Sequence, residues 1–116
     1  MINRFSCAAM VVLSLTGCAS DPAPTEQLRL TEQALAQAKA VGADGQVAEL
    51  AMAEAKLLQA QSAMQRDAFK EARVLAEQAE LDARLAEARV LTQKSQDQLN
   101  ELNNRINRLR KQLGEL

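Results

Sequence analysis

The chain has 116 residues, and its 14 basic and 15 acidic side chains leave a formal net charge of −1 at pH 7. So weak a charge favours neither nucleic acid nor an anionic membrane surface as a partner. The sequence contains no Trp, Tyr or His. An apolar core must therefore be built largely from alanine and leucine, which bury little area per residue and favour long packed helices over a globule with a roomy pocket.

Residues 1–17 have the three parts of an export signal. Arg4 and the free amine supply positive charge, Phe5 to Leu15 are mostly apolar, and small residues precede Cys18. This apolar stretch of 11 residues is shorter than the ~20 that span a bilayer. We therefore expect a signal peptide that is removed; the alternative is an uncleaved helix at the membrane surface.

The run Leu15-Thr16-Gly17-Cys18 resembles the lipobox of bacterial lipoproteins. The resemblance implies cleavage between Gly17 and Cys18 and acyl chains such as palmitate on Cys18, and two or more such chains give a stable anchor. Cys7 would be removed, so no disulfide is possible within the mature chain. Ala19 stands where Asp would signal retention in the inner membrane, which implies a lipid-anchored protein of the outer membrane that faces the periplasm.

Residues 18–25 lack periodicity and contain two prolines, as expected of a lipidated tether. Thr25 and the first periodic residue, Leu28, predict a helix that ends near Val41. Gly42 suits its C-terminal cap, and Asp44 is placed to accept hydrogen bonds from the first N–H groups of the next helix.

From Gln46 to Leu113 the chain contains neither proline nor glycine, and strong helix formers dominate it. Two apolar seams run through this part, but a charge at Asp67 interrupts the first. We therefore predict a turn at 65–67, capped by Asp67, and an antiparallel helical hairpin over residues 26–90. The alternative is one unbroken helix of roughly 100 Å. The seams comprise Leu50, Ala53, Leu57, Ala60 and Met64, then Phe69, Ala72, Ala76, Ala79, Ala83, Ala86 and Val90.

A third seam lies on a separate face of the last predicted helix and continues to the end of the chain. Its final part is a regular heptad stripe, which is typical of a coiled coil or of a helix that binds a partner. Residues 91–116 are therefore expected to form a coiled-coil tail, with a basic cluster from Arg105 to Lys111 that would set its pairing. The alternative is that this cluster meets an acidic partner or a peptidoglycan carboxylate. The partner-binding candidates are Leu99, Leu102, Ile106, Leu109 and Leu113, called the terminal stripe below.

The chain offers little for catalysis. Without histidine, and with Cys18 acylated, no side chain can act as an imidazole base or thiolate nucleophile. The carboxylates Glu77, Glu80 and Glu87 lie among arginines three or four residues away, which is typical of a solvated helix face and not of a metal site. We expect no enzyme activity, no cofactor and no metal, and we expect Phe69 to anchor packing at the turn.

The stretch from Ala68 to Ala88, AFKEARVLAEQAELDARLAEA, resembles the alanine-rich lipoprotein domain known as domain of unknown function 4398. An aromatic residue, alanines at steps of three and four, and Asp-Ala followed by Leu-Ala carry the resemblance, which covers roughly Leu28 to Val90. The family usually has glycine near the second turn, where this chain has Asp67. Members often accompany an OmpA-like peptidoglycan-binding module, which implies an envelope role close to peptidoglycan. The tail is similar in style to the major murein lipoprotein but ends without its lysine, so covalent linkage is not expected.

These observations predict an all-α lipoprotein: a hairpin of three helices, the last one long, with a coiled-coil-like tail. The function we expect is structural or scaffolding, through self-association of the tail or through a periplasmic partner such as an OmpA-like protein. The alternative is an adaptor or regulator that presents its stripe to an envelope enzyme.

Overall fold

Strong helix formers dominate the chain after Pro24, and helices account for most of it. In the computed structural model, which describes residues 21–114, they are α2 (Thr25–Ala40), α3 (Ala48–Gln65) and α4 (Phe69–Gln112). No strand occurs in this described range. The prediction of an all-α hairpin with a long last helix is confirmed, and the turn after Gln65 excludes the single unbroken helix.

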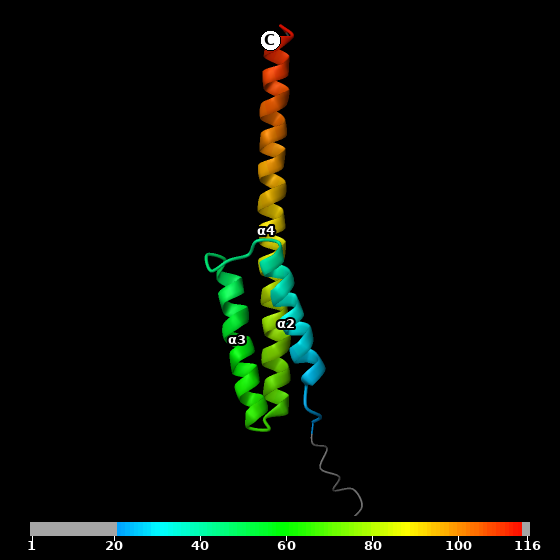
Figure 1. Cartoon of the computed structure of the whole chain (residues 1–116), viewed down its shortest axis with the longest axis vertical. Coiled ribbons are helices and arrows are strands. Elements are labelled where there is room, and N and C mark those ends of the chain that lie inside the picture. Colours follow the sequence, from blue (N-terminus) through cyan, green and yellow to red (C-terminus); the bar gives the residue numbers. More distant parts are fainter. Residues whose placement is uncertain (1–20, 115–116) are drawn as a thin grey trace, which may run out of the picture.

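The three helices run up, down and up along one axis (Figure 1). Both α2 and α3 pack against the first half of α4, and they also contact each other. The second half of α4 continues alone beyond this bundle, so its C-terminal end lies far from the end where α2 begins (Figure 1). At 1.5 Å per residue, the 44 residues of α4 span about 66 Å.

Alanine forms most of the contact surface between the helices. A methyl group is the smallest side chain that still excludes water, so it lets helix axes approach toward the ~8 Å end of their usual range. Leu35 and Leu50 are the larger members of the core. Most residues of both predicted seams are buried, whereas Leu57, Met64, Phe69 and Val90 are half-buried. The fully buried alanines are Ala38 on α2, Ala53, Ala60 and Ala63 on α3, and Ala72, Ala76, Ala79, Ala83 and Ala86 on α4.

Gly42 ends α2 in the way its position predicted. Its φ of 102° is in the left-handed region, where glycine carries no steric penalty. The Gly42 N–H donates to the Lys39 carbonyl and the Ala43 N–H donates to the Ala38 carbonyl, and each bond is 2.9 Å long. This pair of bonds is the Schellman motif, which satisfies the last carbonyls of a helix.

The same motif ends α3, with Asp67 in the position of Gly42. The Asp67 N–H donates to the Met64 carbonyl and the Ala68 N–H to the Ala63 carbonyl, and Asp67 has a φ of 57°. The prediction that Asp67 caps α4 is wrong, because the residue before α4 is Ala68 and no side chain caps that helix. Asp67 instead takes the left-handed position that this turn requires, which aspartate tolerates better than most residues.

Asp44 also acts one step earlier than predicted. Its Oδ1 accepts a 2.9 Å hydrogen bond from the Gln46 N–H, but Gln46 precedes α3, whose first flanking residue is Val47. The carboxylate therefore stabilises the loop and does not cap the helix itself.

One buried polar residue, Thr31, was not predicted from the sequence. Thr31 on α2 is fully buried, and its hydroxyl oxygen lies 2.9 Å from the Gln27 carbonyl oxygen and 2.9 Å from the Ala76 carbonyl oxygen on α4. A side chain can reach the backbone of a neighbouring helix in this way only where small residues bring the two helices close together.

Enlarging one buried alanine should destabilise the bundle. Ala83→Leu adds three carbons where a fully buried methyl group now fits, and overpacking of this kind costs about 1–3 kcal/mol. Ala55→Leu, at an exposed position of α3, is the matched control and should leave the free energy of unfolding nearly unchanged. Urea unfolding followed by circular dichroism measures both. Equal stability of the two variants would contradict tight packing at Ala83.

Candidate partner-binding surface of the terminal helix

After Lys94, α4 has no other part of the described chain beside it. Every residue from Leu91 to Gly114 is exposed. The ammonium group of Lys94 donates a 2.6 Å hydrogen bond to the Val41 carbonyl at the end of α2, which ties the base of the tail to the bundle. Beyond Lys94, the helix presents its whole circumference to solvent.

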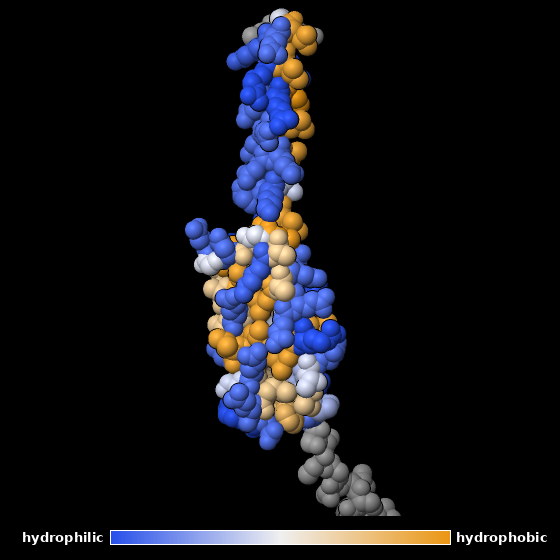
Figure 2. All heavy atoms as spheres, in the orientation of Figure 1, coloured by the Kyte–Doolittle hydropathy of each residue, from blue (hydrophilic) through white to orange (hydrophobic). Residues whose placement is uncertain are grey.

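The terminal stripe forms one apolar edge of this tail. The exposed fractions of its five members run from 38% for Ile106 to 74% for Leu113. Figure 2 shows hydrophobic residues along one side of the tail and hydrophilic residues over the other. The structure therefore brings all five predicted partner-binding residues onto one continuous, uncovered surface.

This surface lies nearly opposite the buried alanine face of α4. Successive residues of a helix are ~100° apart, and the heptad positions of the stripe, continued backward, reach Leu85 and Leu81 on the outer side of the bundle. Both leucines are exposed, while their neighbours Ala83 and Ala86 are buried. One helix thus has two faces of different use: alanine against the bundle and leucine toward solvent.

The seam is not equally apolar along its length. Ala88, Thr92 and Ser95 separate Leu81 and Leu85 from the terminal stripe. The strong apolar contact surface is therefore concentrated between Leu99 and Leu113. Leu91, which is 45% exposed, lies just beside the seam, at the flanking position seven residues before Gln98, and was not among the predicted residues.

Ion pairs between helices surround the bundle. Lys56 on α3 pairs with Asp82 on α4 at 2.6 Å, and Lys39 on α2 pairs with Glu54 on α3 at 2.7 Å. The Lys56–Asp82 pair is partly buried, whereas the Lys39–Glu54 pair is exposed, and exposed pairs contribute about 0–1 kcal/mol each. Their placement across helix boundaries favours one register of the three helices over others.

Arg89 and Glu49 form a further pair, at 2.9 Å, where the tail leaves the bundle. The second oxygen of Glu49, Oε2, is buried without a hydrogen-bond partner among the described residues. This pair joins the start of α3 to α4 just below the free part of the helix.

Glu80 accepts hydrogen bonds from two helices. Arg84, one turn later on α4, and Gln27 on α2 both donate to it, at 2.6 and 2.7 Å. The Arg84 bond and then the Gln27 bond hold the pKa of the Glu80 carboxyl below its ordinary value. On the surface of α2, the hydrogen bond between Arg29 and Glu26 likewise lowers the pKa of Glu26 and raises that of Arg29.

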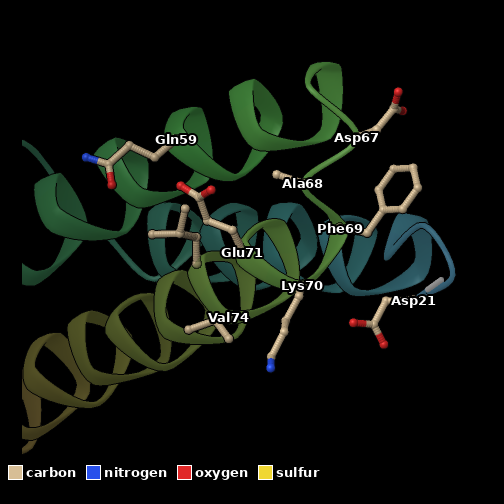
Figure 3. A pocket seen from close by; sticks show the side chains of 9 residues that line it. Asp21, Gln59, Asp67, Ala68, Phe69, Lys70, Glu71 and Val74 are labelled. Carbon is tan, nitrogen blue, oxygen red and sulfur yellow. The ribbon is translucent and has the colours of Figure 1, made fainter. Parts of the chain in front are cut away.

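An open hollow lies at the turn between α3 and α4. Phe69, Val74 and Leu75 supply its apolar lining, and the Phe69 ring lies between Asp67 and Asp21 in the view of Figure 3. Phe69 is only half-buried and is not part of the core around Leu35 and Leu50. The charged side chains of Asp21, Asp67, Lys70 and Glu71 also line the hollow.

A second hollow lies where the tail leaves the bundle. Val47, just before α3, and Glu49 of α3 line one side, and Leu85, Ala88 and Thr92 of α4 line the other. The seam thus passes through a shallow groove before it reaches the free tail. In residues 21–114, no group of three or more acidic or cysteine side chains is placed to hold a metal ion.

Comparison with known proteins agrees with this architecture. The sequence profile of the domain of unknown function DUF4398 matches residues 26–102, which is more than half of the chain. The chain belongs to the DUF4398 family. The family match continues past residue 90, so the family pattern includes the start of the tail as well as the bundle.

A crystal structure of a DUF4398 family protein from Pseudomonas aeruginosa PAO1 is similar to this chain. The two are 68% identical in sequence and superpose with a TM-score of 0.79, and the match covers 81% of this chain and 98% of the other. Among curated proteins, none matches. The family name assigns no activity, so function rests on the chemistry of this chain's own surface.

The predicted lipidation and cleavage residues, Cys18 and Gly17, lie outside the described residues. Between Asp21 and Gly114, no helix is long and apolar enough to cross a membrane. The predicted hairpin domain and tail meet on one continuous helix, α4, with no break at residue 90.

Removing the Glu80 carboxylate should change how stability depends on pH. Its folded pKa lies below the unfolded value of about 4.3, so its contribution is present above that pH and is lost as pH falls through the lowered folded pKa. The free energy of unfolding of Glu80→Gln should therefore fall below that of the native chain at pH 7, and the difference should shrink in acid. Urea unfolding across a pH series measures this, with Glu77→Gln as the control for loss of one charge. A pH-independent difference would contradict the assignment.

Proposed function

We propose that this DUF4398 protein is a non-enzymatic outer-membrane lipoprotein with a structural or scaffolding role in the cell envelope. Lipid on Cys18 anchors it, and the terminal helix reaches into the periplasm and either self-associates or binds a periplasmic partner. The observation that carries the proposal is the terminal stripe: five large apolar residues left uncovered on one edge of a free helix. Exposed apolar surface of this regularity is costly in water and usually marks an interaction site.

The positions of the two ends of the chain support the same function. Asp21 lies three residues after Cys18, and the chain enters the bundle at the end opposite the tip of α4 (Figure 1). A lipid anchor on Cys18 would therefore hold the bundle near the membrane and leave the terminal stripe at the distant end. This arrangement suits a protein that holds or reaches another envelope component.

Acylation of Cys18 is tested by metabolic labelling with a palmitate analogue. We expect the native chain to be labelled and Cys18→Ser to remain unlabelled, because the serine oxygen does not replace the thiol in the lipidation step. Cys7→Ser is the matched control and should retain the label, since Cys7 lies in the segment predicted to be removed. In-gel fluorescence of the immunopurified chain gives the result. Equal labelling of native chain and Cys18→Ser would refute the anchor.

Contact through the stripe is tested by photocrosslinking in intact cells. A photoreactive residue at Ile106 should give a defined adduct, with a second copy or with another protein, whereas the same residue at Asn104, off the stripe, should give little. Introducing Leu102→Asn and Leu109→Asn should abolish the adduct, because polar side chains disrupt an apolar helix contact. Glu101→Asn with Arg108→Asn, at the same spacing but off the stripe, is the control. Equal adducts from Ile106 and Asn104 would argue against the stripe.

A further inference from the structure

The residues beside the terminal stripe are unusual in their charge. In the heptad frame that places the stripe at the two core positions, the two flanking positions hold Gln, Asn and Arg and no acidic residue. Arg105 lies on one flank and Arg110 on the other, and both are exposed. The flanking residues of the free tail are Gln96, Gln98, Asn103, Arg105, Arg110 and Gln112.

A second copy of this chain complements these flanks poorly. Flanking residues of paired helices face each other across the apolar seam and set partner choice. Where two identical tails pair within residues 96–112, in either orientation, Arg105 and Arg110 meet arginine, glutamine or asparagine and no carboxylate. The apolar part of the seam is also short, because Ala88, Thr92 and Ser95 precede it. Self-pairing would therefore bury only a short apolar core, and its flanking residues would repel each other or contribute no attraction.

The charge at the end of the described tail is of one sign, and the acidic residues Asp97 and Glu101 lie earlier and off the flanks. From Asn103 to Gly114 the chain has four basic residues and no acidic one. Arg105 is hydrogen-bonded to Glu101 of its own helix, but both side chains are more than half exposed. Exposed pairs within a helix contribute little to stability, so exchanging Glu101 for a carboxylate on another helix costs little.

We propose that the terminal stripe binds an amphipathic helix of a different protein, one that has Glu or Asp on both sides of its own apolar seam. This inference rests on the proposed function and specifies its partner. The five stripe residues supply the apolar contact, and the guanidinium groups of Arg105 and Arg110 hold carboxylates on either edge, where their planar forks match carboxylate geometry. Arg108 and Lys111, on the remaining surface, add long-range attraction that steers the acidic helix toward the tail.

The proposal is tested with two synthetic helical peptides that share one leucine and isoleucine seam. One has Glu at all flanking positions and the other has Lys. Each fluorescent peptide is titrated with the chain, purified from membranes in mild detergent, and binding is followed by anisotropy. We expect the Glu-flanked peptide to bind about tenfold more tightly than the Lys-flanked one, with the difference reduced by salt.

Charge reversal on the flanks should invert this preference. Arg105→Glu with Arg110→Glu should bind the Lys-flanked peptide more tightly. Arg108→Glu with Lys111→Glu makes the same change in net charge off the flanks and should keep the original order. Helical content by circular dichroism shows whether each variant remains folded. If both double variants lower the affinity for the Glu-flanked peptide equally, binding depends on overall charge, and the proposal is wrong.

Three further outcomes distinguish failure of the acidic-partner proposal from failure of the proposed function. Equal affinity for both peptides that is lost in Leu102→Asn with Leu109→Asn would leave the proposed function standing and refute the acidic partner. Sedimentation of the chain as an oligomer that the Glu-flanked peptide does not dissociate would assign the stripe to a second copy and also refute it. Binding of neither peptide, together with a monomeric chain, would refute both the acidic partner and the contact role of the stripe.

Discussion

Close approach of helices through alanine is the constraint on which this structure depends. A core of methyl groups gains little from the area it buries, roughly 25 cal/mol per Å², so it must gain from backbone proximity and from many small contacts along long helices. The buried alanines of α4 follow each other at steps of three and four, which keeps them on one face for the length of the bundle. The position of Thr31 between two backbone carbonyls is a direct result of this proximity.

The polar groups around the alanine seam determine the register of the three helices. Alanine seams have little shape to distinguish one register from another, and specificity must come from elsewhere. The Lys56–Asp82 and Lys39–Glu54 pairs and the Gln27–Glu80 hydrogen bond each join two different helices. The two Schellman turns act in the same direction, because each fixes the point at which one helix stops and the chain reverses.

Much of this architecture could be predicted from the sequence because it depends on local patterns. The periodicity of Ala72 to Ala86 identifies the buried face of α4, and the charge at Asp67 shows where the first seam ends. The role of Asp67 could not be derived in this way. An aspartate before a helix suggests a cap, and only the backbone angle of the preceding turn shows that it occupies a left-handed position instead.

The terminal stripe could also be predicted from a local pattern, but the groove at its base could not. The heptad steps from Leu99 to Leu113 are visible in the sequence. The groove formed with Val47 and Glu49 was not visible, since it depends on where α3 begins beside α4. Thr31 and the Lys94–Val41 bond also connect residues more than 40 positions apart, which no local pattern indicates.

The continuity of α4 has a consequence for direction as well as reach. Because one uninterrupted helix forms both the bundle face and the tail, the angle at which the terminal stripe points is fixed relative to α2 and α3. Each residue of helix contributes ~100° of rotation about the axis. The number of residues between Ala86 and Leu99 therefore sets both how far the terminal stripe lies from the bundle and the direction in which it faces. A molecule held at one end would thus offer its leucines in a single direction, and neighbouring molecules of like orientation could align theirs.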